Sequence, residues 1–115
     1  MNIETLREYC LSKPHVTECL PFDDVTLVFK VMNKMFAIIP TDELELSIAL
    51  KCNPEWAIEL REQYESIIPG FHLNKQHWNT VKVDGSISDS FIKELVDHSY
   101  DLIVQSLPKK IRDTM

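Results

Sequence analysis

Glycine is scarce in this sequence, since Gly70 and Gly85 are the only two among 115 residues. Loops that cradle phosphate, such as GxGxxG and GxxxxGK[ST], need several closely spaced glycines, so neither motif is present. The GxSxG nucleophile elbow and the HExxH metal-binding pair are absent too. These absences argue against nucleotide-cofactor chemistry and against the common hydrolase mechanisms. We therefore expect a protein that is not an enzyme and uses no cofactor.

Cysteine is also sparse, and its three positions form no known ligand pattern. Cys10, Cys19 and Cys52 lie far apart and make neither a CxxC pair nor a Cys/His zinc spacing, which is typical of reduced thiols in a cytoplasm. His72 and His77 are five residues apart, but no spacing indicates a third ligand, so we expect no metal site. The segment Met1–Glu4 lacks a basic region followed by an apolar run, so we expect no secretory leader, and no apolar run approaches the 18 residues or so that span a bilayer. The sequence predicts one cytoplasmic domain over residues 1–115 with no membrane contact.

Acidic residues outnumber basic ones, but they are distributed unevenly along the sequence. The formal net charge is −6 and the isoelectric point is near 5.1, which argues against general adhesion to nucleic acid or anionic membrane. The acidic residues are spread over the segments with helical periodicity, whereas Ser66–Val83 and Leu102–Arg112 contain none. Any polyanion must therefore meet a local positive patch.

The order of apolar patterns predicts an α+β fold. Helices are expected from the N-cap Asn2 to Pro14, from the N-cap Asn53 to about Ser66, and from Ser86 or Ser88 to Leu107. Alternating apolar residues predict strands over Val25–Val31, Met35–Ile39, Leu44–Leu50 and the region of Val81 and Val83, with a tight turn at Asn33. His15 is expected in a turn. The predicted architecture is an antiparallel sheet covered by helices, in the order α-β-β-β-α-β(β)-α.

The stretch Pro69–Val83 gathers His, Lys, Asn and Trp without a carboxylate, and we interpret it as the functional face. Its Pro-Gly start and its alternating end place the polar cluster on a loop that enters a strand, where binding residues are common. Trp78 has two interpretations. It can cover the edge of the core, or it can be a partly exposed platform that stacks on bases beside Lys75, His77 and Asn79.

Several runs along the chain match a pattern found in one protein family. They are Phe29–Val31, Lys34–Ala37, Leu50–Glu55, Leu60–Tyr64, Pro69–Asn79, Asp84–Gly85, Ser99–Leu102 and Leu107–Lys110. The chain resembles the MmcQ/YjbR family over nearly its whole length, and the Pro-Gly to His-Trp-Asn segment is the most specific part.

This resemblance implies a small bacterial protein with a fold like that of the bacterial frataxin homologue CyaY and a DNA-binding-like "double wing" of sheet hairpins. Carried over by position, the wing contains His72, Asn74, Lys75, His77, Trp78 and Asn79, with Lys51 and Arg61 as neighbours. The chain has Asp23 and Asn33 where glycine is common in the family, and Asp23 and Asp24 add negative charge near the expected surface. We therefore expect weak affinity for DNA. The first helix offers Glu4 and Glu8 rather than a dense acidic ridge, which disfavours an iron-binding role.

Two functional hypotheses remain. The first is a non-enzymatic module that binds double-stranded DNA weakly through the polar wing around Lys75–Asn79. The second is a protein- or small-ligand-binding domain that uses the same loop around Trp78, which predicts an exposed apolar patch or a concave pocket there.

Overall fold

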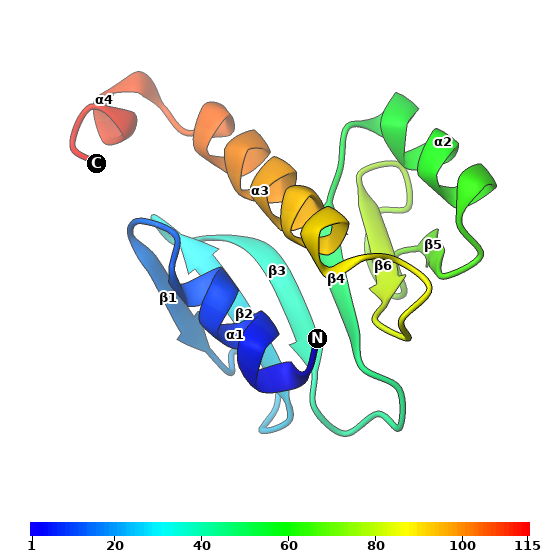
Figure 1. Cartoon of the computed structure of the whole chain (residues 1–115). Coiled ribbons are helices and arrows are strands. Elements are labelled where there is room, and N and C mark those ends of the chain that lie inside the picture. Colours follow the sequence, from blue (N-terminus) through cyan, green and yellow to red (C-terminus); the bar gives the residue numbers. More distant parts are fainter.

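Helices α1 and α3 lie on one face of a six-stranded sheet, and the computed structural model describes all 115 residues (Figure 1). The helices are α1 (Ile3–Leu11), α2 (Pro54–Gln63), α3 (Asp89–Ser106) and the short α4 (Lys109–Arg112). The strands are β1 (Val16–Cys19), β2 (Thr26–Val31), β3 (Lys34–Pro40), β4 (Ser47–Lys51), β5 (Ile67–Pro69) and β6 (Trp78–Lys82). The predicted α+β class with an antiparallel sheet is confirmed.

The sheet is antiparallel throughout, in the order β1-β2-β3-β4-β6-β5. Strands β2, β3 and β4 form the predicted meander. The turn between β2 and β3 consists of Met32 and Asn33, whose φ angles of 48° and 69° are both positive, as a two-residue hairpin turn matching the sheet twist requires. The expected tight turn at Asn33 is therefore confirmed, with Asn33 in a left-handed conformation.

Two predicted element boundaries are wrong, and one strand was not predicted. Strand β1 occupies Val16–Cys19, directly after the turn at His15, and pairs with β2 at the sheet edge. Helix α2 ends at Gln63 rather than Ser66 because Tyr64 takes an extended conformation. Strand β4 begins at Ser47, so Leu44 is not part of it and is fully exposed. The observed order is α-β-β-β-β-α-β-β-α-α.

The helix ends follow the local sequence. Asn2 and Thr5 form a reciprocal capping box at the start of α1, and the Asn53 side chain accepts hydrogen bonds from the backbone of Glu55 and Trp56 at the start of α2. Ser88 caps α3, which ends before Pro108 as predicted. None of the helices combines the length and the apolar character needed to cross a bilayer.

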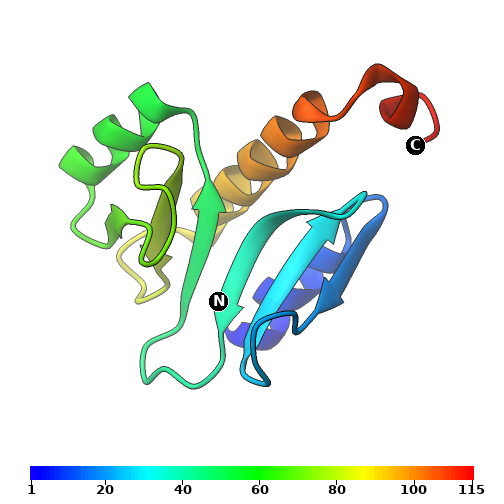
Figure 2. The same cartoon turned by 180° about the vertical axis from the view of Figure 1, so that it is seen from behind.

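Apolar side chains pack on both faces of the sheet. The main core lies between the sheet and the helices, and its largest fully buried side chains include Phe29, Phe36 and Ile48. A second cluster of Val28, Ile38, Ala49 and Trp78 lies on the other face, which we call the open face. Figure 2 views the molecule from this side, with α1 and α3 behind the strands. The open face is where the expected functional loop lies.

Candidate functional site

Two hairpin connections leave the sheet at the same end. The Met32–Asn33 turn joins β2 to β3, and the loop Gly70–His77 joins β5 to β6. The last residue of β4, Lys51, pairs with Trp78 at the start of β6, so β4 ends between the two hairpins. We call this the hairpin end of the sheet. The double wing that the family resemblance implies would correspond to these two hairpins.

Unpaired lysines gather at the hairpin end. Lys34 and Lys75 are exposed, and Lys30 and Lys51 are half-buried on the open face. The structure contains three ion pairs, made by the Met1 amine, Arg7 and Lys13, so none of these four lysines is neutralised by a carboxylate. The nearest polar partner recorded for any of the four ammonium groups is the Gly70 carbonyl, 3.4 Å from Lys75 Nζ. The ammonium groups are therefore available to an anionic ligand.

Negative charge on the sheet connections lies at the opposite end. Six exposed carboxylates occupy the segments before β2, between β3 and β4, and after β6, namely Asp23, Asp24, Asp42, Glu43, Glu45 and Asp84. The two hairpin connections contain no carboxylate at all. The net charge of −6 is thus compatible with a locally positive surface, because the potential near a charged patch depends on its closest groups.

Trp78 is a packing residue, and the prediction of an exposed stacking platform is wrong. Its exposed fraction is 8 %, and it packs with Val28, Ile38 and Ala49 on the open face. Gly70 lies so close that a Cβ built on it would be 2.9 Å from Trp78 Cβ. Because Trp78 is almost fully enclosed and Leu73 of the loop packs against its cluster, Trp78 cannot stack on a base without a rearrangement of the loop. The structural interpretation of Trp78 is the one confirmed.

Asn79 and Arg61 support the loop from within. Asn79 is 2 % exposed, and its Oδ1 accepts a hydrogen bond of 2.6 Å from Arg61 Nε. The Arg61 amino group donates to the carbonyl oxygens of Lys75 and, at 3.4 Å, Trp78. The prediction that Asn79 contacts DNA directly is wrong because its side chain is enclosed. Arg61 is half-buried, with its Nε directed to the Asn79 side chain and one amino group to backbone carbonyls of Lys75 and Trp78.

The remaining predicted residues lie on the outer side of the loop. His72, Asn74 and Lys75 are exposed, and His77 is half-buried. Asn74 shapes the turn, because its Oδ1 accepts from the Gln76 backbone at 2.9 Å and its carbonyl accepts from the backbone of Trp78 at 2.9 Å. His72 has a φ of 60°, a left-handed conformation that few residues other than glycine adopt, and its ring lies 4.0 Å from that of Phe71. The structure therefore places Lys51, Lys75 and His77 at the hairpin end, whereas His72 lines a hollow on the open face.

A hollow of about 640 Å³ lies beside the loop on the open face, although Trp78, where the second hypothesis expected a pocket, does not line it. Its floor is formed by strand residues that include Ile38, Ala49 and Thr80, and its walls come from connections between strands. Phe22 and Phe71 line it while remaining 65 % and 75 % exposed. Their only signal in the sequence is that Phe22 follows Pro21 and Phe71 follows Pro69-Gly70.

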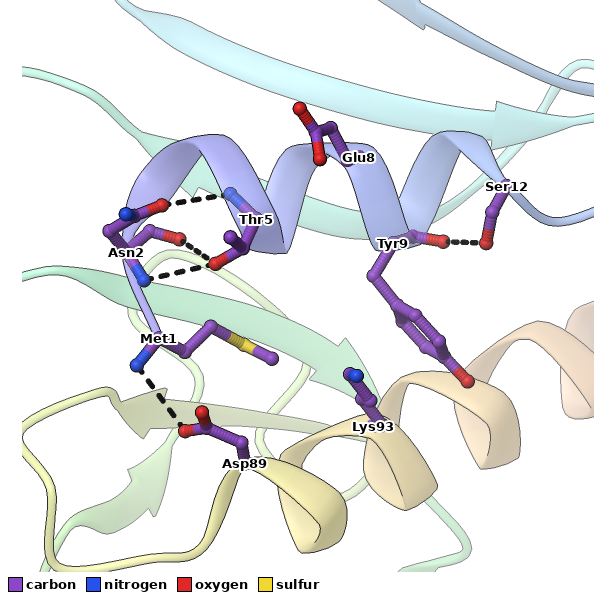
Figure 3. A pocket seen from close by; sticks show the side chains of 8 residues that line it. All are labelled: Met1, Asn2, Thr5, Glu8, Tyr9, Ser12, Asp89 and Lys93. Atoms are coloured by element: carbon purple, nitrogen blue, oxygen red, sulfur yellow. Dashed lines mark hydrogen bonds and ion pairs between the residues drawn. The ribbon is translucent and has the colours of Figure 1, made fainter.

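A second hollow, between α1 and the start of α3, is lined mainly by polar groups that contact one another (Figure 3). The Met1 amine lies 3.3 Å from Asp89 Oδ1, and Lys93 Nζ lies 5.3 Å from the centre of the Tyr9 ring. The Tyr9 hydroxyl donates to Asp97 over 2.6 Å. We interpret this hollow as the polar seam that joins α1 to α3.

The structure offers little for nucleophilic or metal chemistry. Cys52 and His98 line one small cavity, yet burial raises the pKa of the Cys52 thiol to about 11, so the reactive thiolate is disfavoured. Burial also lowers the pKa of His98. No group of three or more His, Cys, Asp and Glu side chains is placed to hold a metal ion.

Comparison with known proteins gives a consistent relationship. The family model described as YjbR matches residues 11–102. The uncharacterized protein YjbR of Escherichia coli K12 is 40 % identical over 112 residues, which are 97 % of this chain and 95 % of that protein. The crystal structure of Deinococcus radiodurans DR2400 superposes with a TM-score of 0.92 at 40 % identity, covering 98 % of this chain and 86 % of that one. A crystal structure of a Pseudomonas syringae protein gives a TM-score of 0.77 at 27 % identity, over 89 % of this chain and 98 % of that one.

Proposed function

The chain belongs to the YjbR family, and we propose that it is a non-enzymatic module that binds double-stranded DNA weakly through the hairpin end of its sheet. The observation that carries this proposal is the segregation of charge along the strands. Lysines without carboxylate partners occupy the hairpin end, and the acidic connections lie at the other end. An elongated polyanion can approach the first surface while keeping away from the second.

Backbone contact is the mode of binding that this surface supports. Lys34, Lys51 and Lys75 supply point charges for phosphate, and Asn74 and His72 supply exposed polar groups beside them. With Trp78 and Asn79 enclosed, the loop presents neither a stacking ring nor an amide from these positions. We therefore expect recognition of the DNA backbone rather than of base sequence.

The number of cations sets the expected salt dependence. If about three lysines meet phosphates, affinity for a duplex falls roughly forty-fold for a fourfold rise in salt, and the dissociation constant at physiological salt is about 10⁻⁴ to 10⁻⁶ M. Fluorescence anisotropy of a labelled duplex at 50 and 200 mM salt measures both quantities. Absent binding at 50 mM salt, or binding that does not change with salt, would overturn the proposal.

Strand β6 provides a matched control for this experiment. Lys51 pairs with the first residue of β6, whereas Lys82 is the last residue of β6 and lies at the acidic end. Lys51→Ala, Lys75→Ala and Lys82→Ala all change the net charge by the same amount. We expect the first two to weaken binding and to reduce the slope of log affinity against log salt by about 0.9 each, and Lys82→Ala to have a smaller effect. Equal effects in all three variants would contradict binding at the hairpin end.

A second candidate function is a ligand-binding domain, and the observation that favours it is the hollow beside the same loop. The volume of about 640 Å³ lies within the range of about 300–1,000 Å³ that small-molecule sites occupy. Two exposed phenylalanines at a concave site are also unusual for a surface without a ligand or partner.

A further inference from the structure

The groove on the open face combines an apolar floor with acidic and aromatic walls. Its floor crosses three strands along one row, because Ile38 pairs with Ala49 and Ala49 pairs with Thr80. Phe22 and Asp23 come from the connection between β1 and β2, Glu43 from the connection between β3 and β4, and Phe71 to Leu73 from the hairpin loop. Segments far apart in the sequence therefore surround one hollow.

The charged lining of this groove has one sign. Asp23 and Glu43 are both exposed, and no lysine or arginine is among the twelve lining residues. Neither carboxylate takes part in an ion pair. An anionic ligand would face repulsion there, whereas a cation would gain two favourable interactions at short range.

Asp23 is held in place and kept ionised. Its Oδ1 accepts hydrogen bonds from the backbone of Val25 at 3.0 Å and of Thr26 at 2.7 Å, and its Oδ2 lies 3.0 Å from Thr26 Oγ1. These hydrogen bonds, that from Val25 first, hold the pKa of Asp23 below its ordinary value. The carboxylate therefore remains a fixed negative charge at the groove wall near neutral pH, without a cationic partner of its own.

The two phenylalanines add a second preference for positive charge. An aromatic face attracts an ammonium or guanidinium group that lies within about 6 Å of the ring centre. Phe22 and Phe71 lie in different connections, line the same hollow and keep most of their surface exposed to solvent. Their rings also offer apolar surface to the uncharged part of a ligand.

From these observations we propose that the open-face groove binds a small organic amine, with its apolar body on the floor of Ile38 and Ala49 and its ammonium group toward Asp23 and Glu43. This inference deepens the second candidate function and rests on it, while it is independent of DNA binding at the hairpin end. Charge complementarity selects this ligand class, because the groove contributes two carboxylates, two aromatic rings and no lysine or arginine.

Three probes with the same ring but different charge test the proposal. They are 2-phenylethylamine, 2-phenylethanol and phenylacetate, each titrated into ¹⁵N-labelled full-length protein near pH 7.5 without DNA. We expect the amine to shift the backbone amide signals of groove residues such as Asp23, Glu43 and Thr80. The alcohol should bind more weakly and phenylacetate most weakly, with a ratio of about tenfold or more between amine and carboxylate, since two charge contacts are reversed in sign.

Glu43→Gln and Glu45→Gln form a matched pair of variants. Both acids lie in the connection between β3 and β4 and are exposed, but only Glu43 lines the groove. We expect Glu43→Gln to lower the affinity for the amine by about three- to fivefold and to leave the affinity for the alcohol unchanged. Glu45→Gln should change neither affinity. Ala49→Leu should fill the floor of the groove and lower the affinity for all three probes. The amide signals of residues outside the groove should stay unchanged.

The results distinguish the preference for an amine from ligand binding by the groove in general. Equal affinity for the amine and the alcohol would overturn the preference for a cation and leave a groove that binds apolar ligands. Shifts of signals outside the groove, or no shift with any probe while the spectrum is that of the folded protein, would overturn both. None of these results bears on the salt-dependent binding of a duplex.

Discussion

Arg61 donates a hydrogen bond of 2.6 Å from its Nε to Asn79 Oδ1, and this contact ties α2 to β6 beneath the hairpin loop. The same guanidinium also donates to the Lys75 carbonyl on the loop itself. A side chain that the sequence places among the DNA contacts is therefore a support that determines where the loop lies.

Replacing Arg61 should destabilise the protein. In Arg61→Met the buried Asn79 loses the partner of its Oδ1, while its Nδ2 already has no hydrogen-bond partner, so the amide would be left unsatisfied on both atoms. Leaving a buried polar group without a partner costs about 1–3 kcal/mol. Urea unfolding measures the loss of unfolding free energy. Arg112→Met is the control, because Arg112 is exposed in α4, and it should change stability by less than about 0.5 kcal/mol. Equal unfolding midpoints for the two variants would show that the Arg61 contact does not hold the loop.

Gly70→Ala should displace Trp78. The added Cβ would lie 2.9 Å from Trp78 Cβ and 3.1 Å from the Trp78 carbonyl oxygen, and overpacking of this kind costs about 1–3 kcal/mol. Gly85→Ala is the informative comparison, because a Cβ there meets nothing within 4 Å but requires a φ of +89°. It should cost about 1 kcal/mol through the backbone alone. We expect only Gly70→Ala to change the fluorescence of Trp78, measured in a Trp56→Phe background. An unchanged spectrum in Gly70→Ala would contradict the close packing of the loop on the indole.

Stability should fall as the pH is lowered from 7.5 to 5.5. His98 Nε2 accepts a hydrogen bond of 3.1 Å from the Asn53 backbone, and burial lowers the pKa of His98, with a smaller opposing effect from Asp101. The unfolded chain therefore takes up this proton at a higher pH than the folded chain, so the free energy of unfolding decreases once the pH falls below the ordinary histidine pKa of about 6.5.

Urea unfolding of the protein and of His98→Gln at several pH values tests this assignment. The variant should show a shallower dependence on pH over this range, because it lacks the titrating imidazole. His15→Asn, which alters an exposed histidine in a turn, should retain the dependence of the original protein. A slope that is the same with and without His98 would assign the pH effect to other groups.

One of the three thiols should react rapidly in the folded protein. Burial raises the pKa of Cys10 to about 12 and that of Cys52 to about 11, and the thiolate is the reactive form. Cys19 is half-buried in the edge strand β1. With dithionitrobenzoate at pH 8, we expect one fast thiol in the native state, three in urea, and none that is fast in native Cys19→Ser. Two or three fast thiols in the native protein would show that its core opens readily.

The strongest local signals predicted the corresponding structure. Asn53 followed by proline begins α2, and the alternation of Val25 to Val31 forms β2, because capping and binary patterning are decided within a few residues. Strand β1 was missed because it has four residues, follows a turn, and gains its ladder from pairing with β2, which sequence periodicity does not reveal. Leu44 was placed in a strand on alternation alone, although the connection before β4 leaves it exposed.

The exposure of the candidate loop was predicted from the sequence, but its internal packing was not. The loop carrying His72, Asn74 and Lys75 was located by its composition, and it is exposed as expected. The enclosure of Trp78 and Asn79 depends on Gly70 and Arg61, which meet them only in the folded chain. The groove brings together residues as distant in sequence as Phe22 and Thr80, so no single stretch could indicate it.

The hairpin loop contributes residues to both proposed binding surfaces. Phe71 faces the groove, whereas Lys75, four residues on, reaches the hairpin end. Occupants of the two surfaces thus act on one short backbone segment anchored at Trp78. If seating an amine shifts that segment and alters the affinity for a duplex by some factor, the duplex must alter the affinity for the amine by the same factor. The affinity of the chain for one of these ligands would then depend on the concentration of the other.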